Sequence, residues 1–141
     1  MKGGIHHIGS TAIPGIAAKP IIDVMVGVRD LGEARAAFGP LGTLAYHPSP
    51  HRRDEAHHFS KPSLRLSEVT HGLHLTEPGS NLWRERLAFR DALRADLTLV
   101  AEYGTLKLVL ARDHGADIDA YTEGKHAFVA RVLAAAGVQL D

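Results

Sequence analysis

The first half of the chain carries its apolar residues in short runs separated by glycine and proline. Runs of this length are typical of strands, and we expect strands at residues 5–8, 21–28, 43–47, 57–61 and 64–75. The run at 21–28 is almost continuous and β-branched, which indicates a strand buried on both faces. Asp23 lies in its middle, where a carboxylate is costly unless it is paired, binds a metal or sits at an open sheet end.

Other residues of the first half predict turns and one helix. A helical period over 31–41 indicates a helix that ends at Gly39–Pro40, and Gly72 indicates a bulge. Pro14 opens at most one helical turn, and residues 48–55 form a polar, proline-punctuated surface loop.

The second half changes to a helical period after residue 77. Ser80 or Asn81 is the expected N-cap of the first of three helices. Strands followed by helices favour an α+β fold. We expect one domain over 1–141, sheet-rich over about 1–76 and helical over about 80–137. Because a core strand begins almost at Met1, an N-terminal segment that covers it is expected to be missing.

Composition narrows the functional classes. Sixteen basic and sixteen acidic residues give zero formal charge, so neither nucleic acid nor an anionic membrane is an expected partner. The chain has no cysteine, no charged leader before an apolar run and no apolar stretch of membrane-spanning length. We therefore expect a cytoplasmic protein, and its open sheet edge indicates that a homodimer could form.

Three basic residues lie beside apolar helix faces. Lys107 follows Tyr103 by four positions, Lys125 follows Tyr121 by four, and Arg90 follows Leu87 by three. Their stems could pack at the core's edge while the charges reach water. Alternatively, the three charges converge on one anionic ligand, for which phosphate is the common candidate.

A glycine-serine turn and a carboxylate form the second candidate. Gly9 and Ser10 follow the first strand, and Asp23 lies on the next. Such a turn is often only a tight turn with a cap. Backbone N–H groups and a serine hydroxyl can also cradle a phosphate while a neighbouring carboxylate holds Mg²⁺ against it.

The ten histidines suggest a third candidate. Adjacent histidines in a strand point to opposite faces, so no neighbouring pair holds one ion alone. A transition-metal site built from His7, His74 and Asp23 stays open as an alternative.

Five segments together resemble the GrpB family, which is related to the polymerase-β-type nucleotidyltransferases. The resemblance covers most of the chain and rests on residues 7–23, 71–75, 89–94, 103–107 and 121–125. It implies a nucleotidyltransferase-like mixed sheet followed by a helical half. Active nucleotidyltransferases carry Asp-x-Asp after the Gly-Ser turn, whereas this chain has Ile21-Ile22-Asp23, and its third acidic position offers only His74 or Glu68.

The resemblance implies two functions. In the first, the chain binds a nucleotide or another phosphorylated small molecule and transfers a nucleotidyl group with Mg²⁺. Asp23 is then the catalytic residue and metal ligand, and the phosphate contacts come from Gly9, Ser10, Thr11, Lys19, His74, Arg90, Lys107 and Lys125. In the second, the chain is a non-catalytic accessory module that assists a protein partner, because GrpB-like domains also occur fused to dephospho-CoA kinase.

Overall fold

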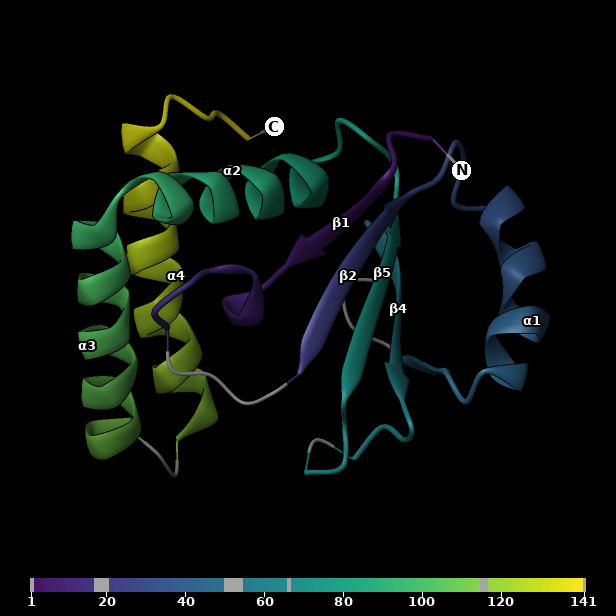
Figure 1. Cartoon of the computed structure of the whole chain (residues 1–141), viewed down its shortest axis with the longest axis horizontal. Helices are drawn as coiled ribbons and strands as arrows, with labels where there is room; N and C mark the ends of the chain where they lie inside the picture. The colour runs from purple at the N-terminus through teal and green to yellow at the C-terminus, as the bar shows by residue number, and fades with distance from the viewer. Residues whose placement is uncertain (1, 17–20, 50–54, 66, 115–116, 141) are drawn as a thin grey trace.

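A mixed five-stranded sheet forms the middle of the molecule (Figure 1). The computed structural model describes residues 2–16, 21–49, 55–65, 67–114 and 117–140. The strand order is β1-β2-β5-β4-β3. The strands are β1 (Ile5–Ile8), β2 (Ile22–Gly27), β3 (His47–Ser49), β4 (Ala56–Lys61) and β5 (His71–Thr76).

Strands β2 and β5 pair in parallel, and the other neighbouring pairs are antiparallel. The register places Asp23 opposite Gly72 and Met25 opposite His74. Side chains alternate between the two faces of a strand, so Asp23 and Met25 point away from the face of Val24 and Val26. Strand β1 lies at one edge of the sheet, and the pairing of a second copy there stays a prediction.

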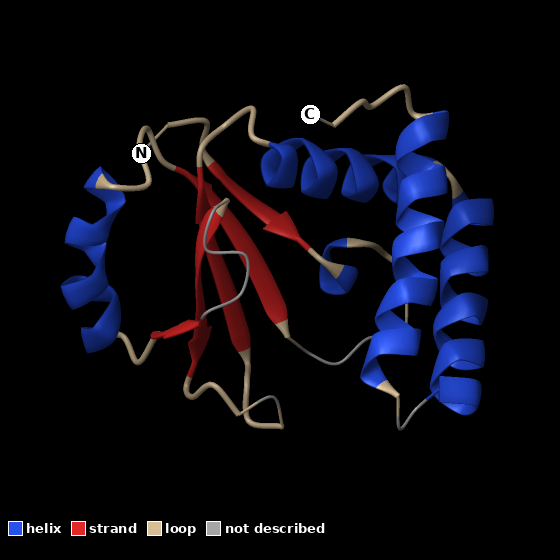
Figure 2. Cartoon of the chain, turned by 180° about the vertical axis from the view of Figure 1, so that it is seen from behind, coloured by secondary structure: helices blue, strands red, loops and turns tan. Residues whose placement is uncertain are grey.

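Helices cover the two sheet faces unequally (Figures 1 and 2). The 3-10 turn η2 (Glu33–Ala37) and α1 (Phe38–Thr43) lie on one side. The three longer helices lie on the other: α2 (Asn81–Ala95), α3 (Leu97–His114) and α4 (Ile118–Ala135). A second 3-10 turn, η1 (Ser10–Ala12), follows β1 directly.

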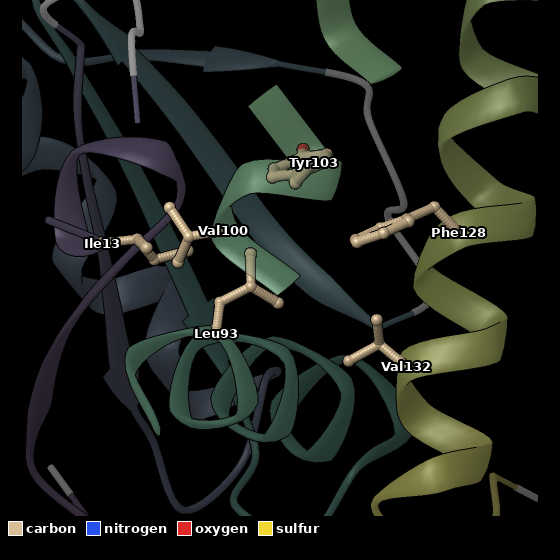
Figure 3. Close-up of a cluster of buried hydrophobic side chains, with 6 residues drawn as sticks. All are labelled: Ile13, Leu93, Val100, Tyr103, Phe128 and Val132. Carbon is tan, nitrogen blue, oxygen red and sulfur yellow. The ribbon is translucent and has the colours of Figure 1, made fainter. Parts of the chain in front are cut away.

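Two apolar clusters follow from this layering. On the α1 side, buried Phe59, Leu73 and Leu75 pack with the valines of β2. Among the long helices, the second cluster consists of Ile13, Leu93, Val100, Tyr103, Phe128 and Val132 (Figure 3). The rings of Tyr103 and Phe128 stack with centroids 5.2 Å apart. Because Ile13 belongs to this cluster, the segment after β1 is anchored to the helical half rather than to the sheet.

The predicted α+β class is confirmed, and so are the three C-terminal helices. The Ser80 hydroxyl accepts the N–H of Trp83 at 3.2 Å, as expected of the N-cap of α2. No helix within the described residues is long and apolar enough to cross a membrane.

Several expectations for the first half were wrong. Gly39–Pro40 lies inside α1 rather than ending a helix, because proline is tolerated in a helix's first turn, where its missing N–H has no acceptor. The third strand is His47–Ser49 instead of 43–47, and Ala45 before it adopts a left-handed φ of 68°. Strand β5 begins only at His71, and the helical turn expected at Pro14 is η1, four residues earlier.

Candidate functional site

The turn between β1 and η1 brings a serine close to the carboxylate of β2. Ile8, the last residue of β1, pairs with Asp23, and the next residue, Gly9, has a φ of 77°. A Cβ at Gly9 would lie 2.8 Å from Asp23 Oδ2. Glycine is therefore required twice, for the left-handed backbone and for the close approach of the carboxylate. The turn places Ser10 beside the strand end that carries Asp23.

Hydrogen bonds hold this turn in place from several sides. The Arg94 guanidinium donates to the Ala12 carbonyl oxygen at 2.8 Å. Thr11 Oγ1 donates to the Ile21 carbonyl oxygen at 3.2 Å and lies 2.8 Å from His7 Nε2. Thr11 and Arg94 fix the turn's geometry through these bonds.

Helix α3 brings Lys107 to Ser10. Tyr103 and Lys107 are four positions apart and so lie on one helix face. Lys107 Nζ donates to Ser10 Oγ at 3.2 Å and lies over the Tyr103 ring, 5.4 Å from its centroid. Burial raises the pKa of the Tyr103 phenol, which stays neutral, whereas burial lowers the pKa of the Lys107 amine.

Helices α4 and α2 add further positive charge. Burial lowers the pKa of Lys125 on α4, and the nearby charges of Lys107 and Arg86 lower it further, while Asp23 acts in the opposite direction. Lys107, Lys125 and Arg86 thus come from three helices and interact electrostatically around one carboxylate. We call Ser10, Asp23 and these three cations the Ser10 cluster. Such a cluster of partly buried cations is suited to bind an anion.

Histidines line the sheet face beside Asp23. His74 is buried, and its Nε2 lies 3.9 Å from Asp23 Oδ1. His58 on β4 is opposite His74, and the two ring centroids are 4.5 Å apart. Gly72 separates Asp23 from β4, and a Cβ there would collide with Asp23 Oδ1. The bulge expected at Gly72 is absent, since this residue pairs with both Asp23 and Ser60.

A hollow of about 430 Å³ opens next to this face. Its described lining comes from four strands and the β4–β5 connection and consists of Ile21, Asp23, Ser49, His58, Ser60, Leu64, Val69 and Gly72. Asp23, a member of the Ser10 cluster, also lines this hollow. A ligand that contacts Asp23 could therefore extend into the hollow.

The structure brings together most of the residues predicted from the sequence. Gly9, Ser10, Asp23, Lys107 and Lys125 gather at the turn, and His74 lies beside Asp23. Lys19 lies outside the described residues.

Arg90 and Thr11 are placed differently from the expected ligand contacts. The Arg90 guanidinium donates to the His7 carbonyl oxygen at 3.3 Å and pairs with Asp91 at 2.8 Å. Thr11 directs its hydroxyl into the turn's own hydrogen bonds. In this structure both groups support β1 and the turn, and a contact from either to a ligand stays a prediction.

Sequence reasoning missed Arg86 and His58. Arg86 lies four residues before Arg90, on the same helix face, so its helical spacing could have identified it. His58 could not have been found, because its partner His74 is set by the register of β4 on β5.

The donor set fits Mg²⁺ only in part. Within the described residues no group of three or more histidine, aspartate or glutamate side chains could hold a metal ion. His7 is directed to Thr11, so the alternative of a transition-metal site from His7, His74 and Asp23 is contradicted. Mg²⁺ commonly takes one or two carboxylates together with ligand phosphates and water. Asp23 can supply one such carboxylate.

Comparisons with known proteins agree with the fold. A family model described as GrpB protein matches residues 1–135. The chain is 39% identical over 132 residues to the glutamate-rich protein GrpB of Alkalihalophilus pseudofirmus, covering 92% of this chain and 76% of that protein. The crystal structure of conserved protein GrpB from Enterococcus faecalis matches with a TM-score of 0.80 and 30% identity, over 95% of this chain and 79% of that one.

The chain also matches part of a longer protein, a dephospho-CoA kinase. The dephospho-CoA kinase of Mycolicibacterium paratuberculosis is 29% identical over 150 residues, which cover 86% of this chain and 35% of that protein. The chain spans from 35% to 76% of the length of the curated relatives it matches.

Proposed function

This chain belongs to the GrpB family, and we propose that it binds a nucleotide or another phosphate-containing small molecule at the Ser10 cluster. The observation that carries the proposal is the contact of Lys107 Nζ with Ser10 Oγ at 3.2 Å, and the charges of Lys107, Arg86 and Asp23 all act on the neighbouring Lys125. A serine hydroxyl and converging cations are the groups that proteins use to bind phosphate.

The electrostatics of the cluster support the same proposal. Lys107 and Lys125 are partly desolvated, and their positive charges repel each other. Asp23 acts in the opposite direction on Lys125. A bound phosphate would offset the repulsion and favour the charged form of both amines.

We propose that Mg²⁺ binds together with the phosphate ligand. Asp23 would hold it by one carboxylate oxygen, and phosphate oxygens and water would complete its shell. Such an ion would neutralise phosphate charge and help to orient the ligand. By the family resemblance, Ile21 occupies the place of the first carboxylate of active nucleotidyltransferases and Asp23 the place of the second. Mg²⁺-dependent nucleotidyl transfer is the more specific form of the proposal.

Calorimetric titration with ATP, GTP, CTP and UTP, each with and without Mg²⁺, tests the proposal on the wild type and on Asp23→Asn. We expect binding that Mg²⁺ strengthens, and loss of the Mg²⁺ effect in Asp23→Asn with phosphate binding itself retained. Release of pyrophosphate would identify nucleotidyl transfer. Absence of binding to all four nucleotides would overturn the proposal.

A second candidate is the accessory role, favoured by the match to a dephospho-CoA kinase and by the single carboxylate of the site. Under this hypothesis the cluster binds a phosphorylated ligand or a partner without chemistry. The test is refolding of a dephospho-CoA kinase that lacks a GrpB-like region, with and without this chain. A higher yield of active kinase supports the role, and an unchanged yield contradicts it for that partner.

A further inference from the structure

Ser10 Oγ contacts a side chain that could activate it. Lys107 Nζ lies 3.2 Å away, and the same Nζ lies over the Tyr103 ring, 5.4 Å from its centroid. Both come from one face of α3, and Tyr103 is only 5% exposed within the helical cluster. Their positions relative to Ser10 are therefore fixed by packing, which is what a reactive serine requires of its neighbours.

The turn also presents Ser10 in a suitable way. It follows a strand directly, at a glycine with a left-handed φ of 77°, and opens the η1 turn. Ala12 and Ile13, two and three residues after Ser10, are 4% exposed and anchor the turn, while Ser10 itself is only partly buried. The turn thus holds Ser10 in place without burying the residue fully.

The surroundings of Lys107 favour its neutral amine. Burial lowers its pKa. The charges of Lys107, Arg86 on α2 and Asp23 on β2 act on the neighbouring Lys125 of α4. The Tyr103 ring, 5.4 Å from Lys107 Nζ, favours the charged amine and so opposes the effect of burial, and Ser10 Oγ accepts a hydrogen bond from it. A lysine that is desolvated and next to other cations is a recognised general base for a serine nucleophile.

We propose that Ser10 is a nucleophile, with Lys107 as its general base, toward activated carboxylic or phosphonic esters. This activity goes beyond the proposed ligand binding and does not depend on it. Ser10 Oγ attacks the ester's carbonyl carbon or phosphorus while its proton passes to the neutral amine of Lys107. The bond to the leaving alkoxide breaks, and the alkoxide takes that proton from Lys107. The products are the Ser10 ester and a free alcohol.

A fluorophosphonate probe tests the proposal directly. Oγ forms a bond to phosphorus, the P–F bond breaks, fluoride leaves, and the serine proton is taken up by Lys107. We expect mass spectrometry of the digested full chain to locate the label on Ser10, with a rate that rises with pH as Lys107 loses its proton. The label should disappear in Ser10→Ala.

Two substitutions of Lys107 test whether its amine acts as a general base or only as a hydrogen-bond donor to Ser10. Lys107→Met should slow labelling by about 10²-fold or more, the usual range for loss of a general base. Lys107→Arg keeps a donor whose guanidinium does not deprotonate, so it should be as slow as Lys107→Met. Thermal unfolding of each variant confirms that it is folded. Wild-type labelling rates in Lys107→Arg would overturn the role of Lys107, and labelling of Ser10 no faster than of exposed Ser67 would overturn the proposal.

Pyrophosphate titration in the same samples separates this proposal from the proposed function. Labelling without pyrophosphate binding would refute only the phosphate site. Binding without labelling would refute only the nucleophile.

Discussion

At the scale of single residues, the site depends on positive charges that are costly to bury. Lys125 is partly buried, the charges of Lys107 and Arg86 lower its pKa further, and Asp23 acts in the opposite direction. Residues of this kind commonly cost stability and are retained for function. We therefore expect the charges of the cluster to lower the free energy of unfolding while they favour ligand binding.

Lys125→Met is the simplest test of these opposite effects on stability and binding. Methionine keeps the length of the side chain and removes the desolvated charge, so we expect the free energy of unfolding to rise by about 0.5–1 kcal/mol. Binding of pyrophosphate should weaken in the same variant. Denaturant unfolding and calorimetry measure the two effects. A destabilised variant with unchanged affinity would contradict this view of Lys125.

The pH dependence of stability follows from the same lysines. A lysine with a lowered pKa binds fewer protons in the folded than in the unfolded chain, so stability rises with pH between the lowered pKa and the ordinary value of 10.5. The raised pKa of Tyr103 has the opposite effect above its ordinary value of 10.0, where the folded chain keeps a proton that the unfolded chain loses.

We therefore expect the free energy of unfolding to increase as the pH approaches 10 from neutrality. The increase should be smaller in the double variant Lys107→Met/Lys125→Met, measured by denaturant unfolding at a series of pH values. An equal increase in the wild type and the double variant would assign it to other groups.

At the scale of elements, two helix glycines form a matched pair. Gly104 on α3 has open space around the position of a Cβ, whereas a Cβ at Gly124 on α4 would lie 2.6 Å from Leu110 Cδ2. Leu110 is buried, so it has little room to move away. The Cβ-free surface of Gly124 is what lets α3 and α4 approach closely.

Gly104→Ala should stabilise the chain by about 0.5–1 kcal/mol, because alanine loses less backbone entropy in a helix. Gly124→Ala gains the same entropy but must displace Leu110, and we expect it to be at least about 1 kcal/mol less stable than Gly104→Ala. Thermal or denaturant unfolding compares the two. Equal stabilisation would show that the helix contact is not tight at Gly124.

The N-cap of α2 is a second test at this scale. Ser80 Oγ accepts the Trp83 N–H and also hydrogen-bonds Thr76, which ties the helix start to the end of β5. Ser80→Ala should cost about 1–2 kcal/mol of unfolding free energy. Ser67→Ala, at an exposed loop position, should change it by less than about 0.5 kcal/mol. Equal effects of the two substitutions would contradict the role of the cap.

At the scale of the whole molecule, sequence patterns predicted the helical half more accurately than the sheet. The three long helices have clear apolar periods and a serine cap, which depend only on local spacing. The α1 region was misassigned because Gly39–Pro40 was interpreted as a stop signal, whereas it lies within the short helix. Strand ends near 43–49 and 64–71 depend on pairing partners that the sequence does not specify.

The candidate site shows the same division. The Gly9–Ser10 turn and Asp23 could be predicted because their neighbourhood follows from a strand, a turn and the next strand. The convergence of Lys107 and Lys125 was expected. The spacing of Arg86 and Arg90 places both on one face of α2, but only the packing of α2 against α3 and α4 shows that Arg86 acts on Lys125 while Arg90 contacts β1. Long-range packing, rather than local pattern, sets these positions.

The central claim is that cations from separate helices converge on Ser10 to bind phosphate. Calorimetric titration of pyrophosphate into the wild type, Lys107→Met and Arg112→Met tests it most directly, since Arg112 is an exposed cation on the same helix, paired with Asp113. We expect Lys107→Met to weaken binding by about tenfold or more, the usual loss for a hydrogen bond to a charged group, with Arg112→Met close to the wild type. Equal weakening in the two variants, or no binding to the wild type, would contradict the account.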